Sequence, residues 1–220
     1  MDFVVVGGRL TRQYVKPIIF LICRVKTKGM WEPLIKNLNK YLSLTAEESD
    51  IVISLFTAKK LRRHQYLLQE GEVARYETFI TRGLTRTYEV DEKGQEHVVQ
   101  FGLEDWWVGD LYSFLTGTPS KYNIDCLEDT HVLQITKPHL ELLYERVPKL
   151  ERHFRLLLQN AFIAVTERVA STLTQSALER YDAFIAHYPQ IEQRVPNRQI
   201  ASYLGITPQS LSRIRGQRRR

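Results

Sequence analysis

The chain has 220 residues, 43% of them hydrophobic, and 31 Lys and Arg against 25 Asp and Glu give a formal net charge of +6. This composition excludes an intrinsically disordered chain and predicts a globular protein with one sizeable core and a small second unit. The two cysteines, Cys23 and Cys126, are far apart and lack metal-ligand spacing. We therefore expect no disulfide framework, iron–sulfur site or zinc site, and a reducing cytoplasm fits best.

The first 29 residues differ in character from the remainder of the chain. Their apolar run, residues 17–23, is much shorter than the roughly 20 residues that span a bilayer, and no small-residue cleavage site follows it. A regular helical pattern starts at Met30. We expect residues 1–29 to be a poorly ordered extension or the product of a mistaken start codon, and a membrane anchor is the less favoured alternative.

Two short helices are predicted within residues 31–56, where apolar residues recur at helical spacing and Thr45 precedes Glu48 as in a capping box. From residue 59 to residue 137 the pattern changes to short runs rich in Tyr, Thr, Val, Ile and Phe, separated by Gly, Asp and Glu turns. Several strands without helices between most of them predict an antiparallel sandwich or barrel. We assign residues 30–147 to this first domain.

Helices are predicted after residue 137, and the longest spans residues 148–173. Its apolar surface forms two neighbouring stripes, which need more cover than one edge of a small barrel offers. We expect this helix to cover the sheet and to pair with its copy in a second subunit; the alternative is that both stripes lie against the chain's own core. A further helix is expected to end at Pro189. The first stripe contains Leu150, Phe154, Leu157, Ala161 and Ala164, and the second contains Leu158, Phe162, Val165, Val169 and Leu173.

A helix-turn-helix is predicted over residues 196–215, inside a C-terminal domain of residues 174–220. Gly205 can adopt the positive φ that the tight turn requires. Thr207 followed by Pro208 is an N-cap with a first-turn proline for the second helix. The residues expected to face inward are Ile200, Ala201, Leu204, Ile206, Leu211 and Ile214.

The second helix of this motif is expected to read DNA with the face that remains outside. Glutamine can contact adenine and arginine can contact guanine in the major groove, so Gln209 and Arg213, four residues apart, are the expected base readers. Phosphate contacts give register and salt-dependent affinity. The alternative for the last three arginines is a solvated tail without a fixed partner. The other outward residues are Ser210 and Ser212, and the expected phosphate contacts are Thr207, Ser202, Arg215, Arg218, Arg219 and Arg220.

Short strands, a long helix and a C-terminal helix-turn-helix, in this order, resemble the Crp/Fnr (cyclic AMP receptor protein / fumarate-nitrate regulator) family of bacterial transcription factors. Residues 67–110 resemble the family's β-roll, and residues 200–215, IASYLGITPQSLSRIR, resemble its DNA-reading motif, with Arg213 where members commonly place a base-contacting arginine. The resemblance implies an α+β protein with a double-stranded β-helix (jelly-roll) domain. It also implies a dimer joined through the long helix, a pseudo-palindromic operator in double-stranded DNA, and RNA polymerase as a further partner.

The segment that matches the family's effector cassette departs from the cyclic-nucleotide pattern. Cyclic-nucleotide binders hold the ribose with a Gly-Glu pair and the cyclic phosphate with an Arg-Ser pair. Here Gly109 and Asp110 stand at the first pair, and Lys121 and Tyr122, or Ser120 and Lys121 in a shifted alignment, stand at the second. Because lysine lacks the planar fork of arginine, we expect an unknown effector or none, with a cyclic nucleotide disfavoured. The cysteine cluster of iron–sulfur members and a haem-ligating pattern are also missing.

Other classes of function have weaker support. The histidines are scattered and no nucleophile-elbow, Walker or zinc-protease string occurs, so an enzyme is not expected. A signalling module whose helix-turn-helix docks another protein is the main alternative.

Many family members continue beyond the helix-turn-helix into a β-hairpin wing. We expect either that the arginine tail substitutes for this wing electrostatically or that DNA affinity is low. Five aromatic residues around the cassette could stack on a flat ligand or form core: Trp106, Trp107, Tyr112, Phe114 and Tyr122.

Overall fold

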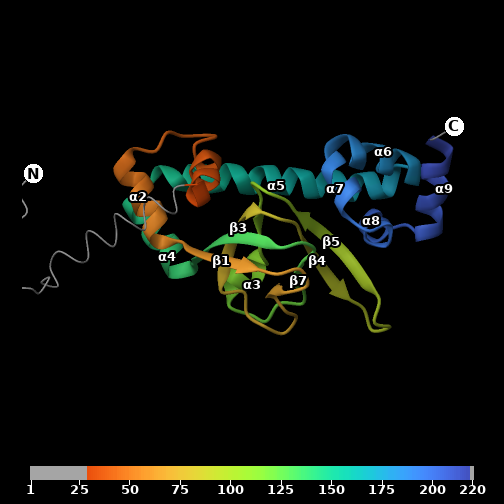
Figure 1. Ribbon diagram of the computed structural model, residues 1–220, viewed down its shortest axis with the longest axis horizontal. Coiled ribbons are helices and arrows are strands. Elements are labelled where there is room, and N and C mark those ends of the chain that lie inside the picture. Colours follow the sequence, from red (N-terminus) through yellow and green to blue (C-terminus); the bar gives the residue numbers. More distant parts are fainter. Residues whose placement is uncertain (1–28, 219–220) are drawn as a thin grey trace, which may run out of the picture.

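The structure is a computed structural model and describes residues 29–218. Residues 1–28 of the predicted N-terminal extension, and the last two arginines, lie outside the described residues. A β-sandwich occupies the middle of the molecule, α5 (Lys149–Thr174) runs along one side of it, and the C-terminal helices gather at the far end of α5 (Figure 1). None of the helices within residues 29–218 is long and apolar enough to cross a membrane.

Two four-stranded antiparallel sheets form the sandwich, as the sequence predicts. The first sheet has the order β1-β8-β3-β6 and the second has the order β2-β7-β4-β5. Strand β5 is therefore an edge of the second sheet, and its pairing with β4 is interrupted by a bulge. The strands are β1 (Thr57–Leu61), β2 (Tyr66–Leu68), β3 (Tyr76–Arg82), β4 (Thr85–Val90), β5 (Glu96–Gly102), β6 (Trp107–Val108), β7 (Asn123–Cys126) and β8 (Thr130–Thr136).

The helices follow the predicted order, with two that the sequence did not indicate. Residues 29–38 are helical, and α2 (Ala46–Leu55) begins at the predicted capping box of Thr45 and Glu48. Pro189 ends α6 as expected, but it also opens the short helix α7, since proline suits the first helical turn. Helix α3, within the effector cassette, is the other addition. The remaining helices are α3 (Leu111–Thr116), α4 (Lys137–Arg146), α6 (Ala177–His187), α7 (Pro189–Arg194), α8 (Asn197–Leu204) and α9 (Pro208–Arg218).

The first hydrophobic cluster fills the sandwich and continues under α5. Phe79 on β3 contacts Trp107 on β6 with ring centroids 5.3 Å apart, and Trp107 contacts Phe154 on α5 with centroids 5.0 Å apart. Tilted and edge-on contacts of this kind stabilise cores beyond the area that they bury. With Leu150 fully buried and Leu157 half-buried, the N-terminal half of the first predicted stripe lies against the β-sandwich.

The second predicted stripe of α5 remains on the surface. Phe162 is 73% exposed and Leu173 is 81% exposed, and the other three members are exposed as well. The alternative in which both stripes lie against the chain's own core is therefore wrong. The exposed stripe consists of Leu158, Phe162, Val165, Val169 and Leu173.

A second hydrophobic cluster joins the C-terminal helices to the outer face of the second sheet. From the β-sandwich it contains residues on or beside β4 and β5, among them Leu84 and Phe101. From the C-terminal helices it contains residues of α6 to α9, among them Tyr181, Ile200 and Leu211. The helix-turn-helix is therefore packed on the β-sandwich by apolar contacts (Figure 1).

A carboxyl group is buried where β3 meets the start of the cassette. A Cβ placed on Gly109 would lie 3.2 Å from Oε2 of Glu77, a tight contact that the carboxyl group would have to relieve by moving a few tenths of an ångström. Oε1 of Glu77 is buried and has no hydrogen-bond partner among the described residues. Burial, with a smaller contribution from the charge of Asp110, raises the pKa of Glu77 to about 8. The folded protein therefore holds a proton on Glu77 at neutral pH.

This buried carboxyl should make stability depend on pH. The pKa of Glu77 rises from an ordinary value of 4.5 to about 8 on folding, so between these pH values the unfolded chain has released a proton that the folded chain keeps. The free energy of unfolding should therefore fall as pH rises from 4.5 to 8. We expect Glu77→Gln, which stays neutral, to gain stability relative to wild type across this window in urea denaturation.

Glu70→Gln removes an exposed carboxylate of the same type and is the matched control. It should keep the pH dependence of the wild type. If Glu77→Gln follows the wild-type curve at every pH, the carboxyl is not held protonated in the fold.

Candidate DNA interface and effector cassette

Helices α8 and α9 form the predicted helix-turn-helix. Gly205 has φ of 66° between them, and its N–H donates to the carbonyls of Ala201 and Ser202. The side chain of Thr207 accepts a hydrogen bond from the N–H of Ser210 at 3.2 Å, which caps the start of α9. The predicted inward residues are buried, except for the half-buried Ile206: Ile200, Ala201, Leu204, Leu211 and Ile214.

The outer face of α9 carries the expected base readers. Gln209, Ser212 and Arg213 are exposed, whereas Ser210 is half-buried at the first turn. Arg213 makes no ion pair within residues 29–218, so its guanidinium keeps its hydrogen-bonding capacity for a partner. Because Leu211 and Ile214 hold the opposite face, the orientation of these side chains is set by the fold.

Arg215 takes a different position from the one expected of a phosphate contact. Its guanidinium donates to the hydroxyl of Tyr181 at 2.9 Å and to the side-chain oxygen of Asn197, and it pairs with Glu192 at 3.2 Å. These contacts connect α9 to α6, α7 and α8. We therefore assign Arg215 a structural role in orienting α9.

Two other residues that were expected to contact phosphate, Arg218 and Ser202, also bond to groups within the protein. Arg218 pairs with Asp182 on α6 at 3.1 Å, so it has a fixed partner and is not a free tail residue. The hydroxyl of Ser202 donates to the main-chain carbonyl of Glu96 at 3.0 Å and accepts from the N–H of Val98 at 2.9 Å. Ser202 thus bonds to β5 in this arrangement, whereas the exposed Thr207 bonds only within its own helix start, where it caps α9.

The five expected effector-binding residues do not converge on one site. Asp110 is buried and caps α3 by accepting a hydrogen bond from the N–H of Ser113, and Gly109 lies against Glu77. Ser120 is buried and its main chain bonds to the turn at Gly71. The side chains of Asp110 and Glu77 lie near each other, and Lys121 does not pair with either of them.

Lys121 points away from these carboxyls. Its ammonium pairs with Glu89 on β4 at 3.4 Å and lies 5.1 Å from the ring centroid of the half-buried Tyr122. Its side chain is 64% exposed, as expected of a surface lysine. A cyclic phosphate bound beside Asp110 would therefore meet carboxyls and not the lysine.

The aromatic residues around the cassette are divided between different parts of the protein. Trp107 and Phe114 belong to or pack on the first hydrophobic cluster, and Trp106 packs on the second with its ring centroid 5.5 Å from that of Tyr188. Tyr112 is 70% exposed. These positions favour the interpretation that the aromatic residues belong to the core and the surface. They do not form a single platform on which a flat ligand could stack.

Two cavities lie outside the cassette. A cavity of about 510 Å³ runs along the exposed side of α5, where Tyr144, Phe154, Leu158 and Phe162 contribute to its lining. A second, of about 320 Å³, lies between α6, α7 and α9 and is lined by Tyr181, Glu192, Arg215 and Arg218. No cluster of His, Cys, Asp or Glu side chains suited to a metal ion occurs within the described part of the chain.

Comparison with known proteins finds a family model that matches the β-sandwich and relatives that match most of the chain. Residues 58–147 match the family model of the cyclic nucleotide-binding domain. The fumarate and nitrate reduction regulatory protein of Vibrio cholerae serotype O1 is 27% identical over 188 residues, which covers 79% of this chain and 74% of that protein. The transcriptional activator protein anr of Pseudomonas aeruginosa is 25% identical over 190 residues, which covers 79% of this chain and 75% of that protein.

Two solved structures illustrate the shared fold. FixK2 from Bradyrhizobium japonicum matches with a TM-score of 0.63 at 20% identity and covers 74% of this chain and 83% of its own. The catabolite activator protein of Thermus thermophilus matches with a TM-score of 0.52 at 17% identity and covers 82% of this chain and 85% of its own. The matched domain, the relatives in sequence and the shared fold agree with the resemblance of this chain to the Crp/Fnr family of transcriptional regulators.

Proposed function

We propose that the protein is a homodimeric transcriptional regulator that binds a pseudo-palindromic operator through α9. The observation that carries this proposal is the arrangement of α9, whose apolar face is buried while Gln209 and Arg213 are exposed four residues apart. A helix held in this way can enter the major groove and present both side chains to base edges. Binding of DNA places its work in the cytoplasm, where RNA polymerase is the machinery that such a regulator acts on.

The dimer is proposed from the exposed stripe of α5. Five large apolar side chains on one face of a helix form a surface whose exposure to water is unfavourable. A parallel copy of the same helix can cover this surface. The cavity along α5 lies on the same side and would be closed by the partner. Two copies joined in this way place two recognition helices on half-sites about one helical turn apart, or a multiple of it.

We also propose that the three-part division of the chain is functional. Residues 30–147 form the sensing domain, residues 148–173 the dimerisation helix and residues 174–220 the DNA-binding domain. The effector of the sensing domain is unidentified, and the cassette argues against a cyclic nucleotide. Asp110 caps α3, the neighbouring Glu77 supplies no positive charge, and Lys121 faces Glu89. An effector would act by shifting the populations of arrangements in which the two reading heads are spaced differently.

A selection from random double-stranded DNA should recover one inverted repeat. Arg213→Ala should relax the base preference at one position in each half-site, with a loss of about 1–3 kcal/mol of discrimination, because a bidentate contact to guanine is removed. Arg146→Ala removes an exposed arginine of the sensing domain and should leave the preferred sequence unchanged. Salt-insensitive binding without sequence preference would instead favour a helix-turn-helix that docks another protein.

The oligomeric state can be tested on α5. Light scattering at micromolar protein should give twice the chain mass of 25.8 kDa for the wild type and the monomer mass for Phe162→Glu, because a buried charge in the helix pair has no partner. Thr174→Glu adds the same charge outside the stripe and should remain dimeric. A wild-type chain that is monomeric under these conditions would remove the dimer from the proposal.

Titration calorimetry with cyclic AMP and cyclic GMP should detect no binding in the low micromolar range or tighter, because the cassette lacks the arginine fork that neutralises a cyclic phosphate. Lys121→Arg should not create binding, since this position faces Glu89 and not Asp110. Tight binding of either nucleotide to the wild type would contradict the assignment.

A further inference from the structure

We propose that His153 makes the attachment of the N-terminal segment, residues 29–45, to α5 sensitive to acid. The neutral ring holds the segment on the helix, and a protonated ring releases it. The proton is then a signal that the β-sandwich domain receives without a bound ligand. The site lies outside the DNA interface, and its test requires no DNA, so this inference stands apart from the proposed function.

The imidazole of His153 is buried between α5 and the N-terminal segment without a hydrogen bond. The residue is 1% exposed, and neither ring nitrogen has a hydrogen-bond partner among the described residues. The ring centroid lies 5.6 Å from that of Tyr41 and 5.5 Å from that of Phe154. A charged imidazolium loses far more on leaving water than a neutral ring does. This packed position therefore suits only the neutral form.

The electrostatic surroundings also oppose a charge on this ring. Burial lowers the pKa of His153 and the ammonium of Lys40 lowers it further, whereas the main chain of Leu38 raises it less strongly. Among the described residues, Lys40 is the charged group that acts on the ring, and no carboxylate from α5 or from the β-sandwich compensates it. Protonation therefore places two like charges in one contact, and release of the segment into water separates them.

The same segment holds a strained turn of the β-sandwich. Asp105, between β5 and β6, has φ of 70°, in the left-handed region that residues other than glycine rarely adopt. The side chain of Asn37 donates to the carbonyl of Asp105 at 3.0 Å and to its carboxylate at 2.9 Å, and Lys40 pairs with that carboxylate at 2.5 Å. Asn37 also accepts from the indole N–H of Trp107 at 3.2 Å. Release of the segment removes these contacts, so the response to acid extends to the turn at Asp105.

The other polar contacts between the segment and α5 do not titrate near neutral pH. Lys149 donates to the carbonyl of Ser43 at 2.5 Å and pairs with Glu48 at 2.6 Å. The hydrogen bond from Lys149 holds the pKa of Glu48 below its ordinary value, so this pair stays charged at pH 5.5. The hydroxyl of Tyr41 accepts from the side-chain amide of Asn160 at 3.2 Å. The ring of His153 is thus the group of this contact whose charge changes.

A single titrating ring determines the size of the expected effect. The released ring has the ordinary histidine pKa of 6.5, and the buried ring stays neutral until the pH falls below its own, lower pKa. The contribution of His153 to the attachment is therefore fully present above pH 6.5 and is lost as the pH falls below this value. Between pH 6.5 and 5.5 the ratio of released to attached segment should rise roughly fivefold.

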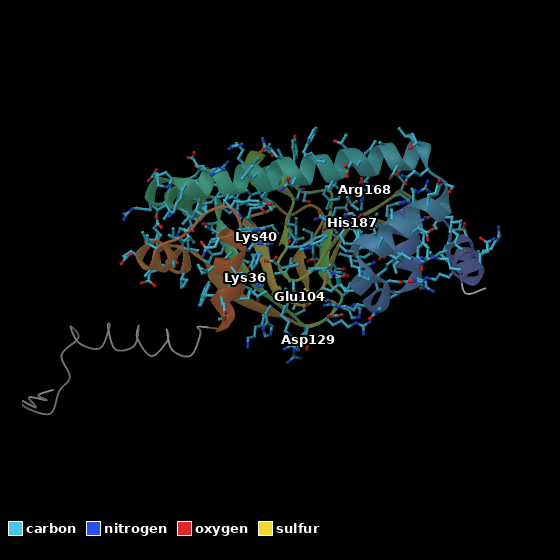
Figure 2. The ribbon with its side chains drawn as sticks, turned by 90° about the horizontal axis from the view of Figure 1, so that it is seen from above. Lys36, Lys40, Glu104, Asp129, Arg168 and His187 are labelled. Carbon is cyan, nitrogen blue, oxygen red and sulfur yellow. The ribbon has the colours of Figure 1, made fainter. Side chains whose placement is uncertain are left out.

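Amide hydrogen exchange in the full-length protein measures this ratio. Exchange of residues 30–38 is divided by that of β4 at the same pH, which cancels the intrinsic pH dependence, and should rise roughly fivefold in the wild type from pH 6.5 to 5.5. His153→Phe keeps an aromatic ring that takes up no proton and should abolish the rise. His187→Gln removes an exposed histidine at the end of α6 and should keep it. Figure 2 labels His187, and it labels Lys40 just after the N-terminal helix.

The proposal is overturned if the wild-type ratio does not change with pH, or if the response to acid persists in His153→Phe. Should this variant fail to fold, the ring signal of His153 in wild-type NMR spectra, assigned by its absence from His153→Gln, gives a second test. This signal should titrate below pH 6.5 as residues 30–38 lose protection. A ring that takes up its proton while these residues stay protected is charged in place, and that result rejects the release.

Discussion

Phe101 on β5 and Tyr203 on α8 lie with their ring centroids 5.4 Å apart, and Trp106 and Tyr188 make a similar contact at 5.5 Å. These contacts belong to one hydrophobic cluster, which contains apolar residues of the C-terminal helices and of the outer face of the second sheet. Apolar burial is the dominant favourable contribution to such packing. The orientation of α9 is therefore set by the β-sandwich as well as by the helix-turn-helix itself.

The arginines of α9 illustrate how one short helix divides its charges between structure and recognition. Arg215 connects Tyr181, Glu192 and Asn197, and it fixes the back of the helix. Burial raises the pKa of the Tyr181 hydroxyl, and its hydrogen bond to Glu192 acts in the same direction, so this phenol remains a neutral donor and acceptor. Arg213, two residues before Arg215, is exposed. A terminal cluster of like charges thus contains residues with different physical tasks.

The effector cassette lies within the segment that matches the cyclic nucleotide-binding domain, but its polar residues differ from the expected cyclic-nucleotide pattern. Asp110 begins α3 and satisfies an N–H of its first turn, a task that a shorter acid performs well as an N-cap. Glu77 occupies the space that Gly109 leaves open. An anionic ligand at this place would face two carboxyl groups, and the lysine of the cassette, Lys121, pairs with Glu89 on β4. Gly109 and Asp110 thus contribute to the folded structure of the sandwich.

Local sequence determined the element types, the capping box at Thr45, the positive φ at Gly205 and the buried face of α9, because these depend on periodicity and on residues within one or two turns. The family and its fold were likewise predictable from the order of elements. Tertiary structure alone decided that Ser202 bonds to β5, that Arg215 faces Tyr181 and that Lys121 pairs with Glu89. Each of these side chains lies on a surface where several partners are chemically equivalent. Only the packing of distant segments selects one partner, and composition and spacing contain no information about that choice.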